Sequence, residues 1–185
     1  MKDLVFDIAF FTEGIAFNGD SLVLGSLGGS ESSLLVMAAA LKRLMGDGGR
    51  VRVFCSCDRP GTYEGVEYLH APDSWQAFAL SEQPEVLISS RSYRPFLQEP
   101  LCRAELSILW CHDILIPQEQ RNCLQAMAHL ARVWLNSEWQ RRQFHTLVPE
   151  LIPPATWVTR NGVSLPLLDQ GEAQTVGKVP GYCIY

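Results

Sequence analysis

Short apolar runs alternate along the chain with helix-length segments, and this alternation predicts strands that are followed by helices. The run over residues 4–12 (LVFDIAFFT) is rich in β-forming side chains and predicts a buried first strand. Similar runs predict further strands at 51–57, 65–69, 85–89, 106–111, 132–135 and 155–159. Strand–helix alternation of this kind indicates a parallel sheet that helices cover on both faces. The predicted fold class is therefore α/β and Rossmann-like.

The clearest helix is expected over residues 30–45, because its apolar residues recur at helical spacing. The residues on that face are Leu34, Ala38, Leu41 and Met45. Further helices are expected over 74–81 and 118–129. Another should begin after Ser137, which forms an S-x-x-Q capping box with Gln140.

A glycine pair opens the first predicted helix, in the segment Gly28-Gly29-Ser30-Glu31. Adjacent glycines let the backbone turn sharply and approach a ligand, because no Cβ stands in the way. The first turn of a helix also presents free N–H groups and the positive end of the helix dipole, which suits a phosphate. The alternative is a tight loop that serves helix packing alone, and Glu31 can favour the dipole or bond the backbone or a ligand hydroxyl. The preceding connection, residues 13–27, exceeds the usual length of about 2–6 residues, as functional loops often do.

Polar residues follow the predicted strands directly. In an open parallel sheet, ligands bind beyond the carboxyl ends of the strands, and the glycine loop falls on the same edge. The residues there are Glu13, Asp58, Arg91, His112, Asp113, Asn136 and Asn161. Their concentration at one edge of an apolar sheet predicts a ligand cleft.

His112 is the strongest candidate for chemistry, since it follows the apolar run 106–111 and precedes Asp113. An imidazole at this edge can exchange a hydrogen bond or a proton with a hydroxyl near neutral pH. The alternative is a histidine that caps the next element or bonds a backbone carbonyl. Helix capping also accounts for Asn136, and turn geometry accounts for Asn161 before Gly162.

Composition limits the function further. The chain has 185 residues, 47% of them hydrophobic and 19% charged, which suits one α/β domain or one domain and a fragment of another. A net charge of −5 and scattered basic residues give no expectation of nucleic-acid binding. No apolar run reaches the length of a membrane span and no signal peptide is recognisable, so a cytoplasmic protein is expected. The six cysteines form no CxxC pair, so no metal is expected. The alternative is a zinc site that involves Cys55, Cys57 and Cys111.

Missing motifs exclude some enzyme classes. The chain contains neither the G-x-S-x-G elbow of acyl-transfer hydrolases nor the P-loop of nucleotide hydrolases. A dinucleotide-dependent oxidoreductase is an alternative, because Asp58 ends the second predicted strand where an acidic residue would bind a ribose. Against it, the glycines read G-x-x-G-G and lie well beyond the first strand.

Several separated segments together resemble one family. In order, they are LGGSESSLLVMAAALKRL, VRVFCSC, EVLISSR, LSILWCHD, RVWLNSEWQRRQF and WVTRNGV. They are similar to the N-terminal domain of group 1 (family 4-like) glycosyltransferases of the two-domain GT-B fold. The resemblance covers residues 6–163. It implies transfer of a sugar from a nucleotide-sugar donor to a glycan, lipid or small-molecule acceptor, with retention of anomeric configuration and without a metal or cofactor.

The same resemblance implies roles for individual residues. The loop Gly28-Gly29-Ser30-Glu31 would face the phosphates of the donor, and His112 would lie near the reacting centre. Because this domain mainly holds the acceptor in the family, the residues that follow the predicted strands would form the acceptor-side rim, namely Glu13, Arg91, Asp113, Asn136 and Asn161. The turn Asn161-Gly162 would close the domain before the linker.

The resemblance also predicts the domain organisation. Residues 1–165 would form the acceptor-side domain, and residues 166–185 a linker and the start of a truncated second domain. In the family, that second domain binds the nucleotide and carries an acidic E-x7-E element, so a chain without it is expected to be inactive alone. The alternative function is a non-catalytic module that recognises a glycan or a partner chain. Self-association through the truncated end and a peripheral place at the membrane are further expectations.

Overall fold

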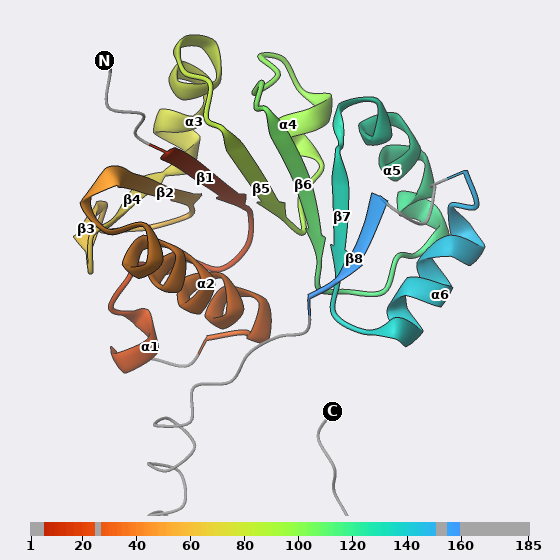
Figure 1. The fold of residues 1–185 in the computed structure, drawn as a ribbon, viewed down its shortest axis with the longest axis horizontal. Coiled ribbons are helices and arrows are strands. Elements are labelled where there is room, and N and C mark those ends of the chain that lie inside the picture. Colours follow the sequence, from red (N-terminus) through yellow and green to blue (C-terminus); the bar gives the residue numbers. More distant parts are fainter. Residues whose placement is uncertain (1–5, 25–26, 151–154, 160–185) are drawn as a thin grey trace, which may run out of the picture.

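The protein folds around one eight-stranded sheet with the strand order β3-β4-β2-β1-β5-β6-β7-β8 (Figure 1). This computed structural model describes residues 6–24, 27–150 and 155–159. All neighbouring strands are parallel except β3 and β4, which form an antiparallel hairpin. The predicted α/β class is therefore confirmed, and residues 160–185, which include the predicted linker, lie outside the described ranges.

The strands agree closely with the apolar runs. Their bounds are β1 (Phe6–Thr12), β2 (Gly49–Cys55), β3 (Gly61–Tyr63), β4 (Val66–His70), β5 (Val86–Ser90), β6 (Leu106–Cys111), β7 (Arg132–Leu135) and β8 (Thr156–Val158). Strand β3 has no counterpart among the predicted strands. It is only three residues long and lies at the edge of the sheet, so it carries almost no apolar pattern.

The helices are α1 (Ser21–Leu24), α2 (Gly29–Met45), α3 (Ala71–Ser81), α4 (Arg94–Leu97), α5 (Gln120–Ala126) and α6 (Glu138–Leu147), with short 3-10 turns at Gly46–Gly48, Pro117–Glu119 and Met127–His129. The helix predicted over 118–129 is thus a shorter α-helix between two 3-10 turns. Helix α1 lies inside the long connection that precedes the glycine loop. No helix among the described residues is long and apolar enough to cross a membrane.

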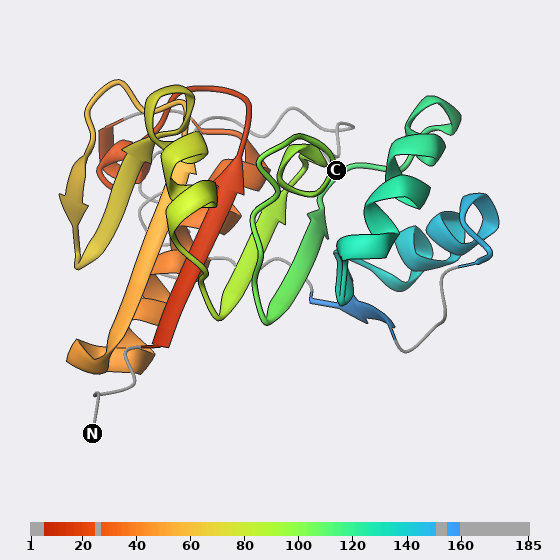
Figure 2. The ribbon, with the colours of Figure 1, turned by 90° about the horizontal axis from the view of Figure 1, so that it is seen from above.

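Helices cover both faces of the sheet, as predicted (Figures 1 and 2). Because side chains alternate along a strand, Phe10 of β1 packs on one face with Leu34 of α2, whereas Phe11 packs on the other face. There the ring centroid of Phe11 lies 4.5 Å from that of Trp75 in α3. Apolar layers therefore stabilise the sheet from both faces, and the polar groups described below lie at its carboxyl edge.

A buried ion network, which the apolar pattern does not reveal, lies at the opposite edge of the sheet. Arg52 of β2 is only 2% exposed and pairs with Asp7 of β1 and with Glu82, whose Oε2 lies 2.6 Å from the guanidinium. The guanidinium also stacks 4.3 Å from the ring centroid of Phe78. Burial raises the pKa of Asp7, while the neighbouring Arg52 acts against that rise.

Candidate functional site at the carboxyl edge of the sheet

Arg91 connects three segments at the carboxyl edge. It follows β5, and its Nε lies 2.6 Å from Oδ2 of Asp113, in the loop after β6. Its Nη1 lies 3.1 Å from Oγ of Ser30 and 3.6 Å from Oε1 of Glu31, both in the first turn of α2. One guanidinium therefore joins the glycine loop, residues 28–31, to residues 112–116 after β6, which we call the His112 loop. Sequence reasoning placed these two segments only on a common edge.

The backbone of Arg91 is in an unusual conformation. Its φ is +61°, in the left-handed region that residues with a Cβ rarely occupy. The N–H of Arg91 donates to the carbonyl of Trp110 at 3.1 Å, which extends the pairing of β5 with β6 by one residue. Strained residues of this kind concentrate at functional sites, where the surrounding structure holds them in place.

Glu31 gives the glycine loop a structural role. Its side chain is buried, at 5% exposure for the residue, and its Oε2 accepts a hydrogen bond from Oγ of Ser30 at 2.8 Å. A Cβ on Gly28 would lie only 2.4 Å from that Oε2, whereas a Cβ on Gly29 would meet nothing within 4 Å. Gly28 thus makes room for the carboxylate, and Gly29 leaves open space at the start of α2. The carboxylate also lies favourably at the positive end of the helix dipole.

His112 is a half-buried residue whose two ring nitrogens are buried and have free hydrogen-bonding capacity. Its ring packs against Trp110, with the centroids 4.4 Å apart. Within the described ranges, neither Nδ1 nor Nε2 has a hydrogen-bond partner, and both atoms are buried. Burial lowers the pKa of His112 to about 4, although the charges of Asp113 and Glu31 act to raise it. At neutral pH the ring therefore offers one N–H donor and one acceptor nitrogen. The alternative of a histidine bonded to a backbone carbonyl finds no support among these residues.

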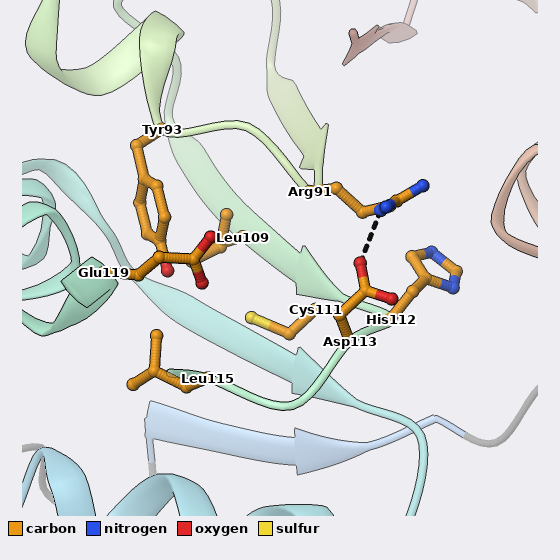
Figure 3. Close-up of a pocket in the computed structure, with 8 residues that line it drawn as sticks. All are labelled: Arg91, Tyr93, Leu109, Cys111, His112, Asp113, Leu115 and Glu119. Atoms are coloured by element: carbon orange, nitrogen blue, oxygen red, sulfur yellow. Dashed lines mark hydrogen bonds and ion pairs between the residues drawn. The ribbon is translucent and has the colours of Figure 1, made fainter. Parts of the chain in front are cut away.

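A small pocket is lined by the Arg91–Asp113 pair and by His112. Its volume is about 50 Å³, enough for a small group of a ligand. Figure 3 shows Tyr93, Cys111 and Glu119 on one side of the ion pair and the His112 ring on the other. Burial raises the pKa of the Cys111 thiol, so this cysteine is a poor nucleophile and serves as part of the wall.

Gln140 closes the site from the side of α6. Its N–H donates to Oγ of Ser137 at 3.1 Å, so the predicted N-cap is confirmed. Its side-chain Oε1 accepts from the N–H of Asn136 at 2.6 Å, one residue earlier than a standard capping box. Its Nε2 donates to the carbonyl of Asp113 at 2.7 Å and to that of Cys111 at 3.2 Å. This second function was missed, because the S-x-x-Q pattern explains the residue fully at the level of sequence.

The remaining predicted residues separate into three cases. Asn136 joins the site, since its Nδ2 lies 3.5 Å from the carbonyl oxygen of His112. Glu13 lies at the same edge but accepts from Oγ of Ser92 at 2.5 Å and lies 3.4 Å from Arg94, so it contacts the start of α4 instead of Arg91. Asn161 lies outside the described residues.

The structure bears on two alternatives raised by the sequence, a dinucleotide site and a metal site. Asp58 is exposed, and among the described residues it forms no ion pair. The glycine loop is separated from β1 by a connection that contains α1, unlike the direct strand-to-helix turn of dinucleotide sites. Within residues 6–24, 27–150 and 155–159, no group of three or more His, Cys, Asp or Glu side chains is arranged to hold a metal ion.

Comparison with known proteins supports the fold. No protein-family model matches the sequence, and no curated protein matches it. Among solved structures, the chain is similar to the apo form of the lipopolysaccharide outer core galactosyltransferase WaaB, with a TM-score of 0.52 and 14% identity. The alignment covers 86% of this chain and 46% of the WaaB chain, so this chain spans about half the length of that structure. The likeness shows a glycosyltransferase-like fold, as the sequence resemblance implied.

Proposed function

We propose that this chain is the acceptor-side domain of a glycosyltransferase that moves a sugar from a nucleotide-sugar donor to an acceptor hydroxyl. Two independent lines support the proposal. The fold is similar to that of a galactosyltransferase, and the polar groups gather at the carboxyl edge, where open α/β sheets bind ligands. The observation that carries it is His112, whose two buried nitrogens have no partner among the described residues. Buried polar atoms are normally satisfied, so such a pair requires an explanation, and a bound hydroxyl supplies one.

Each group has a task in this proposal. The neutral His112 ring would exchange a hydrogen bond with a hydroxyl of the acceptor or of the transferred sugar, close to the reacting centre. Arg91 would hold the start of α2 and the His112 loop in a fixed relation. The free N–H groups at Gly29 would approach the phosphates of the donor.

The finer features are also part of the proposal. The reaction would retain anomeric configuration and proceed without a metal or cofactor, and the acceptor would be a glycan, a lipid or a small molecule. The Glu31 carboxylate beside the helix terminus weakens the attraction for phosphate, so most of the donor affinity would come from groups outside this domain.

A transfer assay tests the proposal. The chain, and any longer chain that contains it, would be incubated with radiolabelled UDP-, GDP- and ADP-hexoses and a panel of glycan, lipid and small-molecule acceptors, with and without EDTA. We expect a labelled product from the longer chain, but not from these 185 residues alone, and we expect it to form equally well in EDTA and to have the anomeric configuration of the donor by NMR. Tight binding of NAD together with the absence of transfer from every donor would contradict the proposal and favour an oxidoreductase.

A further inference from the structure

Three successive backbone carbonyls at the end of β6 are held by the start of α6. The carbonyls of Cys111 and Asp113 accept hydrogen bonds from Nε2 of Gln140, at 3.2 and 2.7 Å. The carbonyl between them, that of His112, lies 3.5 Å from Nδ2 of Asn136. The same Gln140 side chain accepts from the N–H of Asn136 at 2.6 Å. A single amide therefore bridges the residues on both sides of His112.

Burying the polar side chain of Gln140 at this position costs free energy unless its hydrogen bonds are satisfied. It is 5% exposed and lies one turn before the buried Phe144 on the inner face of α6, where an apolar side chain would normally pack. A buried amide is tolerated only when its donors and acceptor are satisfied, and here both N–H groups and the oxygen have partners. Helix capping uses only the backbone N–H of Gln140 and leaves the side-chain donors unexplained.

The imidazole of His112 lacks any such anchor of its own. Neither ring nitrogen is bonded within the described ranges, so the ring is placed by its contact with Trp110 and by the backbone that carries it. Holding that backbone on both sides is the most direct way to orient a ring whose nitrogens must stay free. The bond to Asp113 also reaches Arg91, because Asp113 pairs with the guanidinium at 2.6 Å.

We propose that Gln140 is the positioning residue of this site and that its amide sets the orientation of His112 and, through Asp113, of Arg91. The inference rests on the proposed function for its catalytic meaning, but the geometry it concerns can be measured without a substrate. Gln140 itself touches no reacting atom.

The test compares Gln140→Met with Gln120→Met in the full chain. Methionine keeps the length and approximate volume of glutamine but donates no hydrogen bond. Gln120 is a matched control, because its Nε2 also donates to a carbonyl, that of Leu147 at 2.5 Å, at the far end of α6. The primary readout is the pKa of His112 by NMR titration, since a ring released from its buried position regains hydration. Asp113, Arg91 and Glu31 are the charged groups that act on this ring, and both substitutions keep all three residues in the protein.

We expect the pKa of His112 to move from about 4 toward 6.5 in Gln140→Met and to stay at about 4 in Gln120→Met. In the transfer assay, kcat should fall by about 100-fold in Gln140→Met, as for a misplaced catalytic group, and remain within about 2-fold in Gln120→Met. An unchanged His112 pKa in Gln140→Met, or an equal shift in both variants, would overturn the inference. Should Gln140→Met fail to fold, Gln140→Asn retains the amide but, one methylene shorter, does not reach both carbonyls, and the same outcomes apply. Absence of transfer in a longer chain that contains this domain would contradict the proposed function but not the role of Gln140, because the NMR titration decides that role without a substrate.

Discussion

The Nε of Arg91 lies 2.6 Å from Oδ2 of Asp113, and this ion pair joins the ends of two neighbouring strands. Both side chains are substantially exposed, at 39% and 67%, and exposed ion pairs contribute at most about 1 kcal/mol to stability. The pair nevertheless lines the small pocket together with His112, and its arginine adopts a strained backbone. A weak contribution to stability and a central position together indicate a role in the site.

Replacing Arg91 with glycine should separate function from stability. Glycine relieves the strain at φ +61° and the pair with Asp113 is exposed, but the buried carboxylate of Glu31 loses its cationic partner, so the free energy of unfolding should fall by about 1–3 kcal/mol while the protein stays folded. Transfer should fall at least about 10-fold, because the glycine loop and the His112 loop lose their connection. Chemical denaturation and the transfer assay check this, with the exposed Arg59→Gly as control. An Arg91→Gly protein that loses transfer only because it has unfolded would contradict this prediction.

The two glycines at the start of α2 should respond differently to alanine. In Gly28→Ala the new Cβ would meet Oε2 of Glu31 at 2.4 Å, so the carboxylate must move and stability should fall by about 1–3 kcal/mol. In Gly29→Ala nothing lies within 4 Å, so stability should hold or rise by up to about 1 kcal/mol. If the donor approaches the backbone at Gly29, its KM should nevertheless increase in that variant. Equal stability of the two variants would show that Glu31 does not require Gly28.

His112 should make stability depend on pH in the acid range. Its pKa is about 4 in the folded protein and about 6.5 in the unfolded chain, so between these values the unfolded chain binds more protons. Above pH 6.5 the titration of His112 does not reduce the free energy of unfolding. As the pH falls to about 4, it lowers that free energy by at most about 3 kcal/mol. Denaturation curves between pH 4 and 7.5 measure this fall, and His112→Gln should be less dependent on pH by that amount. Parallel profiles for the two proteins would contradict the burial of an uncharged ring.

Arg52 and Arg50 offer a matched pair on one strand. Arg52→Ala would leave Asp7 and Glu82 without their buried partner, and breaking a buried pair of this kind costs about 3–5 kcal/mol. In the part of the chain that the structure describes, Arg50 forms only exposed pairs, with Glu67 and Glu82, so Arg50→Ala should cost less than about 1 kcal/mol. Urea denaturation of the two variants measures the difference. Similar losses would show that the buried network contributes no more than surface charge.

Sequence reasoning predicted the sheet well, because strands buried on both faces produce continuous apolar runs. It also predicted the edge at which Arg91, His112 and Asp113 meet, since parallel strands all end on one side. It missed β3, whose three residues at the sheet edge carry no apolar signal. Short edge strands form through pairing with a neighbour, and that information is not local.

The contacts within the site could not be predicted in the same way. The S-x-x-Q pattern explains Gln140 as a capping residue, so nothing in the sequence indicates that its amide reaches Cys111 and Asp113 across the fold. The glycine loop looked like a phosphate site, but the burial of Glu31 against Gly28 depends on how α2 packs. Long-range hydrogen bonds and close packing depend on tertiary structure, which spacing along the chain does not encode.

The most direct test of the central claim is the turnover of His112→Ala in the transfer assay, measured beside its free energy of unfolding and beside the exposed His129→Ala. A positioned acid or base contributes about 10²–10⁴-fold, so kcat should fall by at least about 100-fold in His112→Ala and stay unchanged in His129→Ala. The free energy of unfolding should fall by less than about 2 kcal/mol, because the ring makes no hydrogen bond within the described ranges. Full turnover in a folded His112→Ala protein would contradict the account, and so would a loss of turnover that only follows unfolding.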